Sequence, residues 1–241
     1  MIRLRTLFLF LAASCAMAQN SVRVASPNGQ IEFLVTVVLP PAPGSFLRLA
    51  YQVSFKEKPL LDVSYLGFLI HNQEPLLGQT LGLSATKSGH ADGYNWILGE
   101  FLQNGSVGRR INVEVRAYDE GVAFRYLIPR TSALEDIVIE SEETEFRFVR
   151  DVSLPKIQDD LPLTVGQSGV GWVAITEAPL AGFPKMLLDR VDGRTMKVHL
   201  SAVGDRWPVE STTPLTTSWR VLLIASSAQD LNRSRMVERL Q

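Results

Sequence analysis

The chain has 241 residues, 24 Lys and Arg against 25 Asp and Glu, a formal net charge of −1 and 46% hydrophobic residues. This composition excludes a disordered chain, because the apolar fraction is high and the charges balance. There is no basic excess to neutralise a phosphate backbone, so nucleic acid is not expected as a partner. The single cysteine excludes a disulfide scaffold and a cysteine-based zinc site. The length allows one large all-β domain or two small ones.

The N-terminus has the pattern of a secretory signal. Arg3 and Arg5 form a positive n-region, residues 7–13 form an apolar h-region, and Ala-Met-Ala at 16–18 fits a signal-peptidase site. We therefore expect residues 1–18 to be removed and the mature protein to be exported to the periplasm or the extracellular space.

The h-region is too short to span a bilayer as a stable helix, and no other stretch is long and apolar enough, so no transmembrane segment is expected. Two alternatives stay open for this region. One is a buried N-terminal helix. The other is a lipid anchor at Cys15, because residues 11–15 loosely resemble a lipoprotein processing box, with Ala13 in place of the usual leucine.

Alternation of apolar and polar residues runs through the chain, which is typical of strands with one buried face. The first strands are expected at residues 22–25, 31–37 and 47–55. The turn sequence Ser-Pro-Asn-Gly at 26–29 joins the first two, and a longer loop with Pro-Pro-Ala-Pro-Gly at 40–44 joins the next two.

The clearest alternation covers residues 110–118 and is followed by Asp-Glu-Gly and a second apolar run at 122–128. It predicts a hairpin in which Gly121 supplies a positive φ. Further strands are expected at residues 136–140, 144–149, 171–176, 195–202 and 218–225. About a dozen short strands without a long amphipathic helix predict an all-β fold, a large antiparallel sandwich.

Residues 227–241 predict the one helix, which would follow a sandwich domain at 19–226. Ser227 suits the N-cap and Asp230 the first turn. Leu231, Met236, Val237 and Leu240 give it a partial apolar face. The sequence stops inside this predicted helix without a C-cap, as a chain cut in a linker before a further domain would.

Few residues suggest chemistry by their spacing. The sequence contains no dinucleotide-binding or P-loop glycine motif and no nucleophile elbow, and His71, His90 and His199 have no metal-ligand spacing. The acidic run at 140–143 is expected to be a solvated turn. Glu177 ends an apolar run and opens into a Gly/Pro loop, which suits a ligand or catalytic group, although an ordinary exposed glutamate is the simpler interpretation of spacing alone.

Aromatic residues outside the core suggest sugar binding, because flat rings stack on the faces of pyranoses. Trp96, Trp172 and Trp207 are the candidate carbohydrate-binding residues, with Tyr94 and Trp219 as further aromatic candidates. The competing interpretation for each is core packing.

Several sequence blocks, taken in order, carry a family resemblance. They are Ser-Pro-Asn-Gly at 26–29, Leu-Ala-Tyr-Gln-Val at 49–53, Lys-Pro-Leu-Leu at 58–61, Leu-Gly-Phe at 66–68, Arg-Ala-Tyr-Asp-Glu-Gly-Val-Ala-Phe-Arg-Tyr at 116–126, Ile-Thr-Glu-Ala-Pro-Leu at 175–180, Ser-Trp-Arg-Val at 218–221 and Asp-Leu at 230–231. With these blocks the chain resembles the N-terminal domain of glycoside hydrolase family 97, which comprises exported bacterial α-glucosidases and α-galactosidases.

The resemblance implies a β-supersandwich similar to galactose mutarotase. In complete members a catalytic (β/α)8 barrel and a small C-terminal β-domain follow, and the barrel carries the general acid and the nucleophile or base. The N-terminal domain packs on the barrel and contributes a glutamate to an active-site calcium ion, and Glu177 matches that position. Calcium takes about 6–8 oxygen ligands, so calcium is expected as a cofactor only when a barrel completes the site.

Some positions depart from the family. The His usually found before this Glu is Thr176, the Tyr a few residues after it is Phe183, the Pro before Trp-Arg is Ser218, and the barrel is missing from the 241 residues. The resemblance therefore implies a carbohydrate-binding domain for α-glucosides or α-galactosides, partnered by a catalytic barrel in cis or trans. It also implies no catalytic residues in this chain and no hydrolysis by the chain alone.

Two alternatives remain. A free-standing mutarotase-like epimerase would need a His acid and a Glu base facing one cleft. A secreted interaction module without a sugar ligand would show an exposed apolar face and no polar, aromatic-lined cleft.

Overall fold

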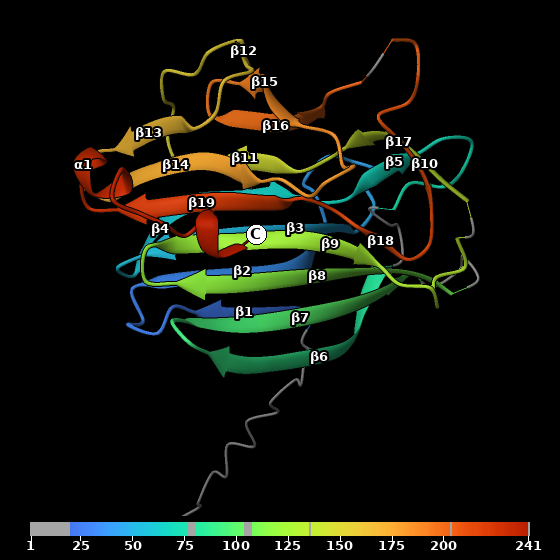
Figure 1. Ribbon diagram of the computed structural model, residues 1–241, viewed down its shortest axis with the longest axis horizontal. Helices are drawn as coiled ribbons and strands as arrows, with labels where there is room; N and C mark the ends of the chain where they lie inside the picture. Colours follow the sequence, from blue (N-terminus) through green and yellow to red (C-terminus); the bar gives the residue numbers. More distant parts are fainter. Residues whose placement is uncertain (1–19, 77–80, 104–107, 135, 203, 241) are drawn as a thin grey trace, which may run out of the picture.

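The computed structural model describes residues 20–76, 81–103, 108–134, 136–202 and 204–240 (Figure 1). The predicted signal segment and Cys15 lie outside the described residues. The fold is all-β and antiparallel, as the alternation predicts, and a single short helix lies near the C-terminus. No helix among the described residues has the length and apolar character to cross a membrane.

The strands and helices follow one another in chain order. They are β1 (Ser21–Ala25), β2 (Ile31–Val38), β3 (Arg48–Phe55), β4 (Lys58–Tyr65), β5 (Phe68–Ile70), β6 (Leu81–Ala91), β7 (Tyr94–Gln103), β8 (Arg109–Tyr118), β9 (Gly121–Ile128), β10 (Asp136–Glu142), β11 (Glu145–Arg147), β12 (Ile157–Gln158), β13 (Leu163–Gln167), β14 (Gly171–Ala178), β15 (Met186–Asp192), β16 (Thr195–Leu200), β17 (Val209–Thr212), β18 (Leu215–Thr216), β19 (Trp219–Ala225), α1 (Ala228–Leu231) and the 3-10 turn η1 (Glu238–Leu240).

An eight-stranded sheet forms one layer of the sandwich, in the order β13-β14-β19-β9-β8-β7-β6, with β18 paired to β9. Three smaller sheets lie against it: β1-β2-β3-β4, β11-β16-β15-β12 and β17-β10-β5. Strands β5, β10, β17 and β18 gather at one end of the molecule, on the right in Figure 1.

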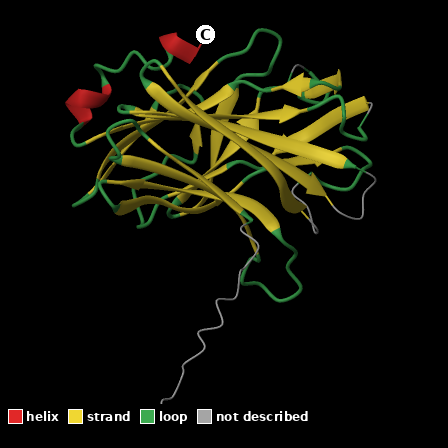
Figure 2. Ribbon diagram, turned by 90° about the horizontal axis from the view of Figure 1, so that it is seen from below, coloured by secondary structure: helices red, strands yellow, loops and turns green. Residues whose placement is uncertain are grey.

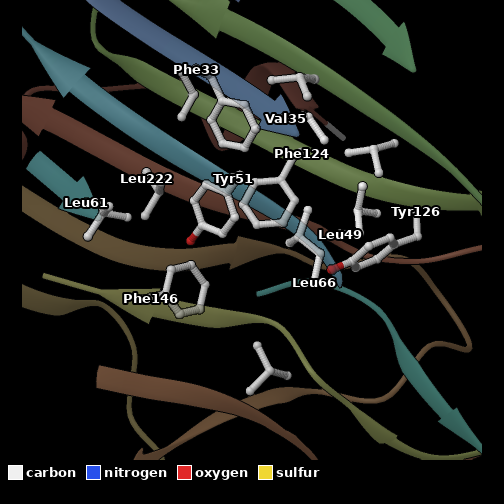
Figure 3. Packing of buried hydrophobic residues seen from close by; sticks show 14 of the residues in the cluster. Phe33, Val35, Leu49, Tyr51, Leu61, Leu66, Phe124, Tyr126, Phe146 and Leu222 are labelled. Atoms are coloured by element: carbon white, nitrogen blue, oxygen red, sulfur yellow. The ribbon is translucent and has the colours of Figure 1, made fainter. Parts of the chain in front are cut away.

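One continuous core includes residues of all four sheets, and its aromatic centre lies between the eight-stranded sheet and the β1-β2-β3-β4 sheet. Tyr51 on β3 stacks on Phe33 on β2 with ring centroids 4.9 Å apart. Phe124 on β9 lies 5.4 Å from the Phe33 ring and 5.1 Å from the Tyr51 ring (Figure 3). All three are fully buried, and such ring pairs contribute about 0.5–1.5 kcal/mol each beyond area burial.

The predicted Ser-Pro-Asn-Gly turn joins β1 to β2. The Ile31 amide donates to the Ser26 hydroxyl at 3.0 Å, the Gln30 amide donates to Asn28 Oδ1 at 2.9 Å, and Gly29 has a φ of 70°. The side chains therefore satisfy the turn amides, and the glycine takes the left-handed conformation.

The predicted hairpin around Gly121 is also present. Gly121 has a φ of 156°, and a Cβ at this position would lie 2.2 Å from the carbonyl oxygen of Leu222 on β19. The glycine is therefore needed chiefly because the neighbouring strand approaches so closely.

One sequence-based prediction is wrong. The acidic run at 140–143 is not a solvated turn, because β10 continues through Glu142 and the Glu142 side chain is fully buried. The short C-terminal helix is present as α1, which ends at Leu231 and is followed by η1.

The C-terminal segment does not form one long helix, because its apolar residues pack against the sheet. Leu231, Met236 and Leu240 are buried at spacings of five and four residues, and Met236 and Leu240 pack on Tyr118 and Trp219. Ser227 caps α1 as predicted, accepting from the Asp230 amide. Both helical pieces lie outside the strand layers (Figure 2).

Candidate functional site

Glu177 lies near the end of β14, directly opposite Arg220 on β19. Both residues share the strand parity of Ile175 and Leu222, whose side chains are in the core. Glu177 and Arg220 therefore point toward the inner side of the eight-stranded sheet rather than toward its outer face.

Both oxygens of the Glu177 carboxylate already accept hydrogen bonds. The Met186 amide donates to Oε1 at 3.0 Å, and Arg220 Nη1 donates to Oε2 at 3.1 Å. The side chain is 10% exposed. Burial raises the pKa of the Glu177 carboxyl, while the Met186 amide and the Arg220 guanidinium oppose the rise.

Arg220 is itself fully buried and is held by a second carboxylate, Glu142 on β10. Its Nε donates to Glu142 Oε1 at 2.9 Å, and its Nη2 donates to Glu142 Oε2. Burial alone would lower the pKa of Arg220, but Glu142 and then Glu177 raise it. One guanidinium therefore links a buried carboxylate to a slightly exposed one.

A chain of hydroxyls completes the hydrogen bonding of Glu142. Thr144 Oγ1 donates to Glu142 Oε1 at 2.7 Å, and the Tyr126 hydroxyl lies 2.5 Å from Thr144 Oγ1. The Gly67 amide donates to the Tyr126 hydroxyl at 3.3 Å. Burial, and then the nearby Glu142 charge, raise the pKa of Tyr126, so this hydroxyl stays protonated as the network requires.

Glu142 and Arg220 were not among the predicted site residues. Arg220 could have been found, because it falls at an inward-facing position of a strand whose other inward residues, Leu222 and Ile224, are apolar. A charged residue at such a position needs a buried partner. Glu142 was hidden in an acidic run whose composition is typical of a surface turn.

The described residues alone do not suit a calcium ion. Among them, no group of three or more His, Cys, Asp or Glu side chains converges as a metal site. Glu177 supplies one carboxylate, whereas calcium takes about 6–8 oxygens. The carboxylate of Glu177 alone therefore does not make a calcium site.

Trp96 and Trp172 each have a packing role. Trp96 on β7 lies opposite Gly89 and Trp172 on β14 lies opposite Gly166. A Cβ on Gly89 or Gly166 would lie 2.8 or 2.9 Å from the facing indole. Each indole therefore covers the bare backbone of a cross-strand glycine, an arrangement that stabilises glycine-containing strands.

Trp207 is different, because it lies in the segment between β16 and β17. The residue is 43% exposed, and its ring lies against His71 with ring centroids 4.7 Å apart. It lines a hollow of about 390 Å³ together with Phe183, Arg206 and Glu210.

The histidines do not form the acid–base pair of an epimerase with Glu177. His71 Nδ1 lies 2.7 Å from Glu140, His90 Nδ1 lies 2.7 Å from Asn95, and His199 Nδ1 lies 2.9 Å from Asp189. Among the described residues no histidine bonds to Glu177, so this geometry does not favour the epimerase alternative.

The sequence profile described as glycosyl-hydrolase 97 N-terminal matches residues 24–160 and 150–241. The chain belongs to this family. The resemblance inferred from the ordered sequence blocks is therefore confirmed over almost all of the predicted mature chain.

The glycosyl-hydrolase 97 N-terminal family assignment agrees with solved structures. A glycoside hydrolase family 97 enzyme from Pseudoalteromonas sp. strain K8, in complex with panose, has a TM-score of 0.77 and 21% identity, covering 91% of this chain and 38% of that chain. The same enzyme in complex with acarbose gives a TM-score of 0.77 and 20% identity over the same shares. A β-arabinopyranosidase has a TM-score of 0.64 and 18% identity, covering 85% of this chain and 40% of that chain.

These likenesses establish the fold, since the identities are low. No curated protein matches the chain in sequence. The chain spans 38% of the length of the Pseudoalteromonas enzyme, so it corresponds to an N-terminal domain.

Proposed function

We propose that this chain is the N-terminal domain of an exported family 97-type glycosidase. It associates with carbohydrate, packs on a catalytic barrel in cis or trans, and offers Glu177 as one ligand of a calcium ion in the barrel's active site. It does not hydrolyse glycosides alone. The observation that carries this proposal is the Glu177 carboxylate, held at the end of a strand and slightly exposed.

The hydrogen bonds of Glu177 suit it to a fixed ligand. Each carboxylate oxygen accepts one bond, from the Met186 amide or from Arg220, and each keeps a second lone pair. The Arg220 side chain is fixed in place, because its Nε also donates a hydrogen bond to Glu142. A ligand that is already oriented loses little conformational freedom when a metal binds.

The outer face of the eight-stranded sheet supports packing on a barrel. In a one-sided antiparallel sheet this face is expected to be polar, yet Tyr94, Trp96, Leu98 and Leu127 line a hollow of about 250 Å³ there, with Arg116 at its side. Tyr, Trp and Arg are enriched where proteins bind one another.

The position of the aromatic residues on the outer face also suits a docked barrel. The C-terminal segment already packs beside it, with Met236 and Leu240 on Trp219. Trp219 pairs with Ala178, the residue directly after Glu177. Because the Glu177 carboxylate points to the inner side of the sheet, a barrel docked on this outer face would contact it only by also extending around the end of β14.

The metal role is tested on the native polypeptide, including whatever follows Gln241. Calcium titration by calorimetry compares the wild type with Glu177→Gln, and Glu57→Gln, at an exposed turn, is the matched control. We expect Glu177→Gln to weaken calcium binding about 10–100-fold and to remove calcium-dependent thermal stabilisation, with Glu57→Gln unchanged. Wild-type calcium affinity in Glu177→Gln would reject the proposed role.

The prediction of inactivity has its own assay. The recombinant 241-residue chain is incubated with aryl α-glucosides and α-galactosides, and release of the aryl group is followed. We expect no hydrolysis above the buffer rate, because the family resemblance places the general acid and the nucleophile or base on the barrel. Turnover that disappears in Glu177→Gln would contradict the proposal.

A further inference from the structure

We propose that the hollow beside Trp207 is a sugar-binding subsite that takes one pyranose unit of a neutral oligosaccharide. This inference rests on the proposed carbohydrate role, but it requires neither calcium nor the barrel. We call this site the Trp207 hollow. Its lining includes Phe183, Arg206, Trp207 and Glu210.

The Trp207 hollow has the size of a small-molecule site. Its volume of about 390 Å³ falls within the usual range of about 300–1,000 Å³ for ligand pockets. Two connections form it: the loop between β14 and β15 brings Phe183, and the segment before β17 brings Trp207. Loops fixed on a rigid sandwich are common positions for binding residues.

Trp207 offers an aromatic platform with a fixed support. One side of the indole rests on His71, which is held by Glu140 through its Nδ1 at 2.7 Å and by Asn72 through its Nε2 at 2.9 Å. Trp207 stays 43% exposed, so part of its indole is free to contact a ligand. The C–H face of a pyranose ring is a surface of the matching shape and polarity.

The rim supplies hydrogen-bonding groups for sugar hydroxyls. Arg206 Nη2 lies 3.2 Å from Glu210 Oε2, with side chains 74% and 42% exposed. A pair this exposed adds little to folding stability, so both groups remain available to a ligand. A guanidinium donates to a hydroxyl oxygen and a carboxylate accepts from a hydroxyl, which together suit a polyol that is uncharged.

The Trp207 hollow lies close to Glu177. Phe183 lines the hollow, and its ring centroid lies 5.9 Å from the guanidinium carbon of Arg220. Arg220 in turn bonds to Glu177 at 3.1 Å. Phe183 therefore connects the lining of the hollow to the Arg220–Glu177 pair through direct contacts.

The hollows beside the other two tryptophans fit a sugar less well. The one beside Trp172 is lined by a glycine-rich turn and contains no charged side chain. The one beside Trp96 has Glu114, but that carboxylate is already shared between Arg116 and Arg125. In both cases the indole also covers a glycine, which accounts for its position.

Calorimetric titration of panose into the 241-residue chain tests this inference. Trp207→Ala is compared with Trp172→Ala, a matched control because Trp172 is 37% exposed. We expect a dissociation constant of about 1 mM for the wild type, at least about tenfold weaker binding for Trp207→Ala, and no change for Trp172→Ala. Trp207→Phe, which keeps a stacking ring, should bind more tightly than Trp207→Ala.

A second variant covers the case in which Trp207→Ala fails to fold. Arg206→Ala changes a side chain that is 74% exposed, so it should fold normally and still weaken panose binding several-fold. If panose binding were lost in Trp172→Ala but kept in Trp207→Ala and Arg206→Ala, the Trp207 hollow would not be the sugar site. The domain would still bind carbohydrate elsewhere. No binding at about 20 mM panose would also overturn the hollow. Neither result bears on calcium binding by Glu177, which has its own titration.

Discussion

At the scale of single residues, the most costly feature of this domain is a guanidinium that water does not reach. Arg220 and Glu142 are both fully buried, and removing two charges from water costs several kcal/mol per ion before their attraction returns it. The Thr144 hydroxyl, which is itself bonded to Tyr126, satisfies one Glu142 oxygen further. Such an arrangement is a poor way to gain stability. It is a good way to fix the direction of Glu177.

The buried pair gives a stability prediction. Glu142→Gln leaves Arg220 buried with only Glu177 to balance it, so we expect a loss of about 3–5 kcal/mol in the free energy of unfolding. Glu114 is the matched control, since it also bonds to arginines but is 17% exposed. Glu114→Gln should cost under about 1 kcal/mol. Urea denaturation of both variants measures these free energies of unfolding. Equal losses would contradict the expectation that breaking the buried Glu142–Arg220 pair is more costly than breaking a partly exposed one.

At the scale of elements, sequence alternation predicted the strands that bury only one face. β2, β3, β8 and β9 all begin and end within a residue or two of the expected positions. β7 was not predicted, because its outward residues Tyr94, Trp96 and Leu98 are as apolar as its inward ones and blur the alternation. The interface-like character of the outer face is thus the reason for this miss.

The candidate site was predicted only in part. Glu177 and the three tryptophans were visible as residue types at suggestive positions. Strand register sets Gly89 and Gly166 opposite two of the indoles, whereas Trp207 lies in a connection and its position depends on how that connection packs. The Glu142–Arg220 contact joins residues 78 positions apart in the sequence, so no local sequence pattern predicts it.

The hairpin at Gly121 gives a prediction about the contact between β9 and β19. Gly121→Ala would place a Cβ 2.2 Å from the Leu222 carbonyl oxygen, so we expect a loss of at least about 3 kcal/mol in the free energy of unfolding. Gly169 has a φ of 73° with no atom within 4 Å of its Cβ position. Gly169→Ala should therefore cost only the backbone strain, about 1 kcal/mol. Thermal unfolding that gives the same midpoint for both variants would contradict the close approach.

At the scale of the whole molecule, the domain has the features of a part that works with another. Its inner side holds a core and a fixed carboxylate at the strand ends, its outer face has an aromatic and arginine surface, and one loop hollow is lined by Trp207, Arg206 and Glu210. Polar, aromatic-lined hollows do not favour a pure interaction module. The described residues also lack a histidine bonded to Glu177, which does not favour an epimerase.

Sequencing the transcript beyond the codon for Gln241 would decide whether this domain works with a catalytic barrel. We expect that the reading frame continues into a (β/α)8 barrel, or that an adjacent gene supplies one, with carboxylates that complete the calcium site around Glu177. A stop codon with no barrel encoded in either place would contradict the claim that this domain completes a glycosidase active site.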